Sequence, residues 1–262
     1  MNIPRHFSPK KSLGQNFLLD ENIARKIVQL LSPQPDDIIV EIGPGIGVLT
    51  KYIIPTGCRY VGIEIDERLT PLLQKEFAGF PQAEIRHADF RKVNLAELAA
   101  GNKLRLVGNI PYHLTSSIIF AAFAQSHVLR DMMLTVQKEV AQRIVADSQT
   151  GGKDYGILSV ISQTFAQTEI LFKMSKHVFR PKPDVDSAVV RWTFQPPPEH
   201  LLDADFYVRM VKAIFGQRRK TLRRSLAAFL DKEISTAMPV DLQRRPETLS
   251  IRELIQLSNV LL

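Results

Sequence analysis

The sequence contains a single cysteine, Cys58, among its 262 residues. One cysteine forms neither an internal disulfide bond nor a cysteine-rich metal site, which excludes a disulfide-stabilised secreted module and fits a reducing compartment. The sequence also lacks an apolar run long enough to span a membrane, and no apolar signal core follows its N-terminal residues. We therefore expect a globular cytoplasmic protein that has no membrane partner.

Patterns that would indicate a metal site or a serine hydrolase are missing too. The six histidines form no pair at the spacing that metal sites use, so we predict that no metal is bound. Ser116 and Ser117 do not lie in a G-x-S-x-G turn, which is the context of the nucleophilic serine in many hydrolases. The sequence therefore indicates neither of these two kinds of chemistry.

Acidic residues are scarce in one long segment. The chain has 34 Lys and Arg against 27 Asp and Glu, a formal net charge of +7, yet no acid lies between Phe206 and Arg224. The cations of this segment are Arg209, Lys212, Arg218, Arg219, Lys220, Arg223 and Arg224. On a helix of about five turns they would make a positive surface that attracts a polyanion such as a nucleic acid. A solubilising face explains the same run equally well.

Short apolar segments alternate with amphipathic ones over the first two thirds of the chain. The predicted strands are 37–42, 60–65, 83–87, 104–108, 132–136 and 187–194. The predicted helices are 23–31, 48–54, 69–77 and 116–123. This alternation is typical of βαβ units, so we predict an α/β fold with a mostly parallel sheet and helices on both of its faces. Ligands of such sheets bind at the carboxyl ends of the strands.

A proline run marks the predicted domain boundary. Pro196, Pro197 and Pro198 form a stiff segment that continues neither a helix nor a sheet. After it, the stretches 206–215, 220–230 and 251–261 have helical apolar spacing and no strand pattern. We therefore predict a ligand-binding catalytic domain at residues 1–195 and a small all-helical domain at residues 199–262.

A glycine-rich turn follows the first predicted strand, in the segment IIVEIGPGIGVLT at 38–50. Gly43, Gly45 and Gly47 permit a tight turn and close approach of the backbone to a ligand. Glu64 ends the second predicted strand 17 residues after Gly47, a spacing at which an acid accepts hydrogen bonds from ribose hydroxyls. A dinucleotide and S-adenosylmethionine are both candidate ligands.

Three further features favour S-adenosylmethionine. The turn has G-x-G-x-G rather than the G-x-G-x-x-G spacing that seats a pyrophosphate. Glu41, directly before the glycines, repels phosphate and tolerates a sulfonium cation. Asp89, after the third predicted strand, is placed to accept from an adenine amine, although capping of a turn explains it equally well.

The segment Asn109-Ile110-Pro111-Tyr112 directly follows the predicted strand 104–108. An adenine amine is a poor nucleophile because its lone pair is delocalised into the ring. The Asn109 side-chain oxygen and a backbone carbonyl of Asn109 or Ile110 would accept the two amine hydrogens and favour an available lone pair. Pro111 would fix the backbone, and Tyr112 would offer a face on which an extruded base stacks. An ordinary strand-ending turn is the alternative.

Seven segments in order resemble the ribosomal RNA adenine dimethyltransferases. They are KSLGQNFL, EIGPGIGVLT, YVGIEID, HADF, NIPYHLTS, VFRPKPDVDSAVVRW and FGQRRKTLRRSL, and they span nearly the whole chain. The resemblance implies a Rossmann-like, S-adenosylmethionine-dependent methyltransferase that dimethylates two adjacent adenosines near the 3′ end of small-subunit rRNA during ribosome biogenesis. It also implies that the small ribosomal subunit and its rRNA are the partners, and we expect a monomer with no obligate protein partner.

The resemblance also assigns roles to residues. Those implied to bind the cofactor are Asn16, Leu18, Gly43, Glu64, Asp89 and Asn109. Those implied to be catalytic are Asn109, Ile110, Pro111 and Tyr112, which would hold the target amine. Those implied to bind the substrate are Tyr112 and Phe179 on the base, and Arg218, Arg219, Lys220, Arg223 and Arg224 on rRNA phosphates. Without the resemblance, Phe179 is better interpreted as a core residue.

Two kinds of alternative stay open. The first keeps the chemistry and changes the substrate, to large-subunit rRNA as in antibiotic-resistance methylases or to DNA. DNA enzymes usually carry an Asp-Pro-Pro-Tyr type of motif, which this chain lacks. The second alternative is an RNA-binding assembly factor, or a transcription factor, built on a methyltransferase fold without the chemistry. The intact Asn109 to Tyr112 motif argues against that second alternative.

Overall fold

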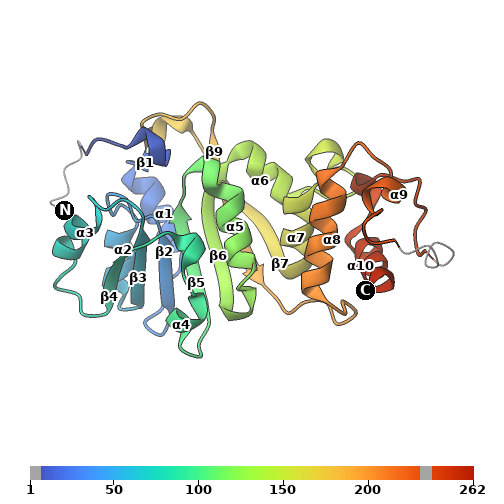
Figure 1. Cartoon of the computed structure of the whole chain (residues 1–262). Helices are drawn as coiled ribbons and strands as arrows, with labels where there is room; N and C mark the ends of the chain where they lie inside the picture. The colour runs from blue at the N-terminus through green and yellow to red at the C-terminus, as the bar shows by residue number, and fades with distance from the viewer. Residues whose placement is uncertain (1–6, 231–237) are drawn as a thin grey trace. The chain divides into compact units, whose positions relative to one another are not determined.

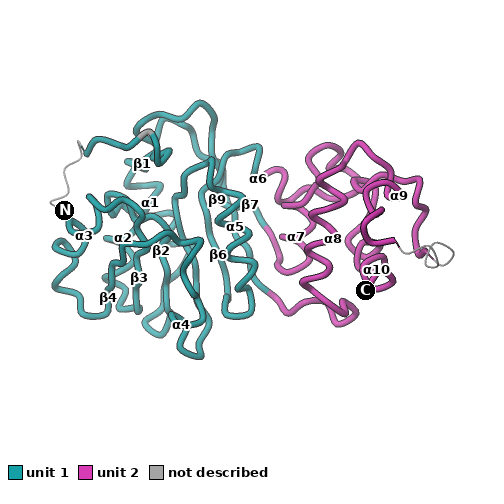
Figure 2. The backbone as a smooth tube through the Cα atoms, viewed as in Figure 1, with its two compact units in different colours: residues 1–141, 169–194 teal, residues 142–168, 195–262 magenta. Residues whose placement is uncertain are grey.

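The computed structural model describes residues 7–230 and 238–262, so residues 1–6 of the first predicted domain and 231–237 of the second lie outside it. The described chain divides into two compact units, drawn in different colours in Figure 2. Unit 1 comprises residues 7–141 and 169–194 of the described chain, and unit 2 comprises 142–168 with 195–230 and 238–262. No helix in the described part of the chain is both long and apolar enough to cross a bilayer.

Unit 1 is built on a mixed sheet with strand order β4-β3-β2-β5-β6-β9-β7 (Figure 1). Its strands are β2 (Ile38–Ile42), β3 (Arg59–Glu64), β4 (Ala83–His87), β5 (Leu104–Asn109), β6 (Leu129–Gln137), β7 (Ala166–Met174) and β9 (Ser187–Phe194). The first five strands in this order run parallel to their neighbours, and β9 pairs antiparallel with β6. The chain leaves β4 and returns to the other side of β2 as β5. This reversal is the place where open α/β sheets bind their ligands.

Helices cover both faces of this sheet. They are α1 (Glu21–Leu31), α2 (Thr50–Ile53), α3 (Thr70–Glu76), α4 (Leu95–Ala99) and α5 (Thr115–Phe123), and α6 (Lys138–Val145) runs into unit 2. Every residue of β2 is buried, as expected of a central strand covered on both sides. On one face, Ile39 and Tyr60 pack in an apolar cluster with α1, α2 and α3. The predicted fold class is therefore confirmed.

Unit 2 is formed by helices in the described chain after residue 195. These are α8 (Ala204–Gly216), α9 (Leu222–Ser225) and α10 (Ile251–Leu261), joined by α7 (Ile157–Phe165) from earlier in the sequence. Two ring pairs tie α8 to this earlier segment: Tyr155 with Phe215, centroids 5.9 Å apart, and Phe165 with Tyr207, 6.3 Å apart. The predicted assignment of residues 142–168 to the first domain is therefore corrected, because their apolar side chains pack with the C-terminal helices.

Two sequence predictions of local structure also need correction. The predicted helix at 220–230 is limited to α9, which starts six residues after the end of α8 and is followed by turns. The first amides of α9, those of Leu222 and Arg223, donate to the carbonyls of Arg244 and Leu242. The basic segment is therefore not one helix of about five turns. In addition, no sequence pattern predicted β7 or the two-residue strands β1 (Phe17–Leu18) and β8 (Phe179–Arg180), which pair antiparallel with each other.

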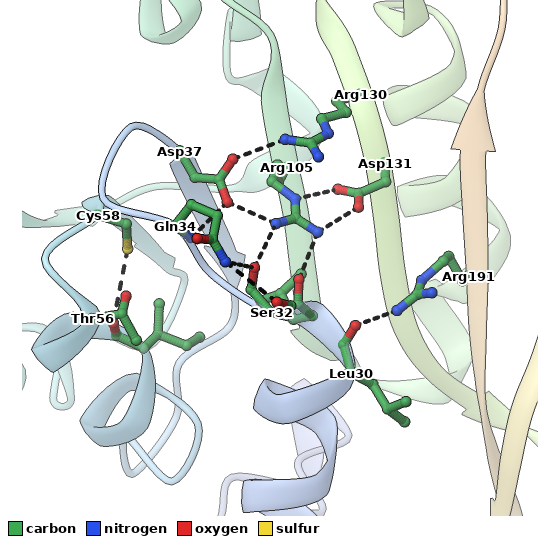
Figure 3. A network of polar contacts seen from close by, with 12 residues as sticks. Leu30, Ser32, Gln34, Asp37, Thr56, Cys58, Arg105, Arg130, Asp131 and Arg191 are labelled. Carbon is green, nitrogen blue, oxygen red and sulfur yellow. Dashed lines mark hydrogen bonds and ion pairs between the residues drawn. The ribbon is translucent and has the colours of Figure 1, made fainter.

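A buried ionic network fixes the amino ends of the central strands, away from the edge where their carboxyl ends lie (Figure 3). The Arg105 guanidinium of β5 donates to both oxygens of Asp131, at 2.9 and 2.7 Å, and to Asp37 at 2.7 Å. It also donates to the carbonyl of Leu31 at 2.6 Å, which caps the C-terminal end of α1. One buried cation therefore joins α1 to the segment before β2 and to β5 and β6.

We predict that Arg105→Leu lowers the free energy of unfolding by about 3–5 kcal/mol, because the buried Asp131 carboxylate would lose the cation that bonds both of its oxygens and Asp37 would keep only one cation, the exposed Arg130. Arg130→Leu is the matched control. Arg130 also contacts Asp37, at 3.1 Å, but its side chain is 60% exposed, so its loss should cost about 1 kcal/mol or less. Urea unfolding measures both variants, and equal losses would contradict the assignment of the network to Arg105.

Candidate active site

A pocket opens at the carboxyl ends of β2, β3 and β5 in unit 1. It is lined by Leu13, Gln15, Asn16, Phe17, Leu18, Glu41, Gly43, Pro44, Gly45, Ile46, Val48, Leu49, Glu64, Ile65, Asn109 and Pro111. One wall therefore comes from the glycine-rich turn after β2, and another from the N-terminal segment around β1. Of the predicted cofactor residues, Asn16, Leu18, Gly43, Glu64 and Asn109 meet at this one pocket.

The glycine-rich turn leaves room for a ligand at Gly43. This residue has φ +67°, in the left-handed region that favours glycine. A Cβ built on Gly43 would meet no protein atom within 4 Å, so a side chain there would project into open space beside the pocket. The backbone at this turn is therefore free to contact a bound molecule directly.

The Glu64 carboxylate is fixed by two backbone amides. Its Oε2 accepts from the Gly45 amide at 2.8 Å, and its Oε1 accepts from the Asp66 amide, also at 2.8 Å. Burial raises the pKa of Glu64, although these amide bonds act in the opposite direction. Each carboxylate oxygen keeps a further lone pair, so Glu64 can accept from a pair of neighbouring hydroxyl groups such as those of a ribose.

Glu41 is the second carboxylate of the pocket. Its Oε2 accepts from the hydroxyls of Thr50 and Tyr60, both at 2.7 Å. Burial raises the pKa of Glu41 to about 7, because it penalises the charged form more than these two bonds favour it. Two carboxyl groups in one pocket disfavour a phosphate when they are ionised, and they suit a ligand that carries positive charge and hydroxyl groups.

Asn109 ends β5 at the edge of the same pocket. Its side-chain Nδ2 donates to the carbonyl oxygen of Asn16, at 2.9 Å. An amide whose nitrogen donates in this way leaves its oxygen as an acceptor for another group. The motif and the N-terminal segment, 93 residues apart in sequence, are therefore joined at the point where the target amine is expected.

The other three residues of the motif come directly after Asn109 in the chain. Ile110 is 3% exposed, Pro111 lines the pocket, and Tyr112 is half-buried. The Tyr112 hydroxyl lies 2.6 Å from the Ser187 Oγ, so its ring is held in place. Burial raises the pKa of Tyr112, which therefore stays a neutral phenol at physiological pH.

Asp89 and Phe179 lie outside this pocket. Asp89 lines an adjoining hollow that shares Gly43 and Pro111 with it, and its carboxylate accepts from Arg91 at 2.9 and 2.6 Å. Phe179 is 4% exposed, belongs to the apolar core and pairs with Leu18 between β8 and β1. A ring in this position presents no face to an incoming base, so stacking would require it to turn out of the core.

The basic residues lie in unit 2. Arg219, Lys220, Arg223 and Arg224 are exposed. Arg218 is different, because its guanidinium donates to the carbonyl oxygens of Lys153, at 2.7 Å, and Gly152, at 3.4 Å. Within the described residues, no three His, Cys, Asp or Glu side chains are grouped so as to hold a metal ion.

Sequence reasoning missed several residues at the pocket. Leu13, Gln15, Phe17 and Ile46 line it, and none of them was assigned a role. The only signal for the first three was their place in the segment KSLGQNFL, because a two-residue strand leaves no periodicity to detect. Asp66, two residues after Glu64, was missed as well, although its amide helps to hold Glu64.

The fold and the pocket together define the class of Rossmann-like methyltransferases. A profile of the family described as ribosomal RNA adenine dimethylase matches residues 6–261. The chain therefore belongs to this family, as its sequence motifs predicted, and the predicted enzyme class is confirmed with it.

Two curated relatives carry the name ribosomal RNA small subunit methyltransferase A. The protein from Salinibacter ruber is 46% identical, over 94% of this chain and 81% of its own. The protein from Chlorobium phaeobacteroides is 41% identical, over 95% of this chain and 92% of its own. Both relatives are thus similar to this chain across its two units.

Two solved structures share the fold. A dimethyladenosine transferase from Plasmodium falciparum superposes with a TM-score of 0.73 at 22% identity, over 92% of this chain and 95% of its own. The 23S rRNA methyltransferase ErmE has a TM-score of 0.67 at 26% identity, over 94% of this chain and 99% of its own. The similarity in fold to each of these structures therefore extends over nearly the whole chain.

We predict that Glu41 makes the protein less stable as the pH rises from 4 to 8. The unfolded chain releases the Glu41 proton near pH 4.5 and the folded chain near pH 7, so the folded state binds more protons in between. Relative to Glu41→Gln, the wild type should lose about 3 kcal/mol of unfolding free energy over this range. Urea unfolding of both proteins at several pH values tests this, and parallel stability curves would contradict it.

Proposed function

We propose that the protein dimethylates the exocyclic amines of two adjacent adenosines near the 3′ end of small-subunit rRNA, during ribosome biogenesis in the cytoplasm. Its partner would be the small ribosomal subunit with its rRNA, bound by a monomer with no obligate protein partner. The observation that carries the proposal is the Asn109 amide, whose nitrogen is bonded to Asn16 and whose oxygen is left to accept from the target amine. The names of the curated relatives support small-subunit rRNA as the substrate.

The pocket residues fit S-adenosylmethionine, which supplies an electrophilic methyl group when it is bound. Glu64 would accept from the ribose hydroxyls, and Gly43 would let the backbone approach the ligand closely. Asp89, in the adjoining hollow, would accept from the adenine amine of the cofactor. The remaining contacts would come from Asn16 and Leu18 on the N-terminal wall and from Asn109.

The residues of the motif would then activate the target amine. The Asn109 oxygen would accept one amine hydrogen, and a backbone carbonyl at Asn109 or Ile110 would accept the other, which favours an available lone pair on nitrogen. Pro111 keeps these acceptors in a fixed relation, and the ring of Tyr112 would stack on the base. This catalysis requires orientation and hydrogen bonding but no strong base. A stacking role for Phe179 stays a prediction.

The direct test offers labelled S-adenosylmethionine with unmethylated small subunits, large subunits and duplex DNA in parallel, and maps the product by mass spectrometry. We expect dimethyladenosine at two neighbouring positions of small-subunit rRNA. Asn109→Ala should lower the rate by roughly a hundredfold or more, because the reacting group would have no preorganised hydrogen-bonding partner. Binding to small subunits should not change.

Other outcomes of this experiment would favour the alternatives. Label in large-subunit rRNA would point to the activity named for ErmE. Binding to small subunits without any transfer would point to an assembly factor that has no chemistry.

We propose that the basic residues of unit 2 contact rRNA phosphates, and we predict their effect on salt dependence. Replacing Arg219, Lys220, Arg223 and Arg224 with Ala should weaken rRNA binding and flatten the log–log salt dependence by about 0.7–0.9 for each phosphate that the protein no longer neutralises. Lys75→Ala, which removes an exposed cation from α3, is the control. Filter binding between low and moderate salt measures the slope, and an unchanged slope would leave these residues as a solubilising face.

Arg218 should behave differently from the other four cations. Because its guanidinium is bonded to two carbonyl groups within unit 2, Arg218→Ala should lower thermal stability as well as binding. Cofactor affinity should not change in any of these variants, since none of the five residues lines the pocket.

A further inference from the structure

Three successive residues of the N-terminal wall, Gly14, Gln15 and Asn16, each lie against a residue far away in the sequence. We call these residues the bridge segment. Gly14 has φ +61°, and a Cβ there would lie 2.5 Å from the His113 Nδ1, so only glycine fits against that ring. Asn16 accepts from the Asn109 side chain at 2.9 Å. Asn16 is thus bonded to the catalytic motif, and Gly14 lies against His113, the residue directly after that motif.

Gln15, between them, is fixed on the loop after β3 instead. Its Nε2 donates to the Asp66 Oδ2 at 2.9 Å. Its Oε1 accepts from the Lys10 backbone amide at 2.8 Å, so both ends of the amide have a partner. The bridge segment therefore connects the catalytic motif to the loop that carries Asp66.

Asp66 is well suited to hold Gln15. It is 1% exposed, and Arg68 donates to it from Nε at 2.9 Å and from Nη2 at 2.6 Å. The bonds from Arg68, despite burial, lower the pKa of Asp66 to about 2, so it is an ionised acceptor at any physiological pH. The backbone amide of Asp66 donates to Glu64, so Asp66 lies next to the residue that is predicted to bind the ribose.

The orientation of the Asn109 amide depends on the carbonyl of Asn16. While Nδ2 donates to that carbonyl, Oδ1 is the atom left for the target amine. If the bridge segment shifts, the amide is free to rotate, and its NH₂ group would then face the hydrogens of the target amine. A rotated amide would repel the substrate group that it should orient.

From these contacts we propose that Asp66 and Gln15 are positioning residues for methyl transfer: their hydrogen bond holds the bridge segment so that the Asn16 carbonyl fixes the Asn109 amide in its reactive orientation. This inference rests on the proposed function, because it assigns Asn109 the role of acceptor for the target amine. It adds a path from the cofactor loop to the catalytic motif. Neither Asp66 nor Gln15 touches the target base in this arrangement.

A swap of the two side chains tests the proposal. Gln15→Glu sets two carboxylates against each other, and Asp66→Asn leaves the Gln15 NH₂ group and the Arg68 guanidinium competing for the one remaining oxygen. In the double variant Gln15→Glu/Asp66→Asn, the Asn amide can donate to the Glu carboxylate, so the hydrogen bond returns with its direction reversed. The Lys10 amide still finds an acceptor, because Glu also offers an oxygen.

The first readout is kinetic. At saturating cofactor, each single variant should transfer methyl groups to small-subunit rRNA roughly tenfold to a hundredfold more slowly than the wild type, as a misplaced catalytic group does. The double variant should be about tenfold faster than either single variant, which is a coupling expected of residues in direct contact. KM for the rRNA should stay constant, since the change lies in the orientation of Asn109.

The second readout needs no activity. The side-chain NH₂ signal of Asn109, assigned by its absence in Asn109→Asp, reports the bond to Asn16 in a ¹⁵N–¹H spectrum of the free protein. We expect this signal to shift and to exchange faster with water in both single variants and to return in the double variant. Gln82→Glu is the matched control, because Gln82 is equally half-buried and bonds a carbonyl outside the bridge segment.

The outcomes separate the two proposals. An unchanged Asn109 signal in both single variants, or a double variant no better than the worse single one, overturns the positioning role. If the variants that carry Asp66→Asn do not fold, Gln15→Glu still decides the question, because Gln15 is only half-buried, and an unchanged Asn109 signal in that variant overturns the positioning role. Should the signal respond as expected while wild-type protein methylates no small-subunit rRNA, the proposed function fails and the structural link between Asp66 and Asn109 stands.

Discussion

The buried carboxylate of Glu64 is the group on which the arrangement of the site depends. It is 3% exposed, and a carboxylate at such a position is stable only when hydrogen bonds replace its water. The amides of Gly45 and Asp66 supply them. These two hydrogen bonds therefore fix the position of the glycine-rich turn after β2 relative to the loop after β3. A ligand that binds to Glu64 therefore finds the glycine-rich wall of its pocket already formed.

The same contact reaches the catalytic motif through a chain of hydrogen bonds. Asp66, whose amide holds Glu64, accepts from Gln15, and the next residue, Asn16, accepts from Asn109. Ligand-binding and catalytic groups are thus linked through an N-terminal segment with little regular structure of its own. The ionic network around Arg105 secures the opposite ends of β2, β5 and β6, so the edge that carries the site has a rigid support.

The α/β pattern and the glycine-rich turn could be predicted because they depend on neighbours in sequence. Strand β2 is apolar except for Glu41, and Asn109 is the last residue of β5, so the glycine-rich turn and Asn109 were assigned to the correct edge of the sheet. Strand β7 was missed because it lies at the edge of the sheet and is largely half-exposed, which leaves no clear alternation. Residues 142–168 were assigned to the wrong unit because only packing against α8 and α10 reveals where they belong.

By itself, the sequence determined the class of the fold, the order of the central strands and helices, and the identity of about half of the pocket residues. Those properties follow from local periodicity and from motifs that are contiguous in the chain. Tertiary structure decided that Asn16 meets Asn109, that Phe179 lies in the core, and that Arg218 is bonded within unit 2. Each of these depends on groups distant in sequence, whose approach is set by the pairing of strands and the filling of a core rather than by any short pattern.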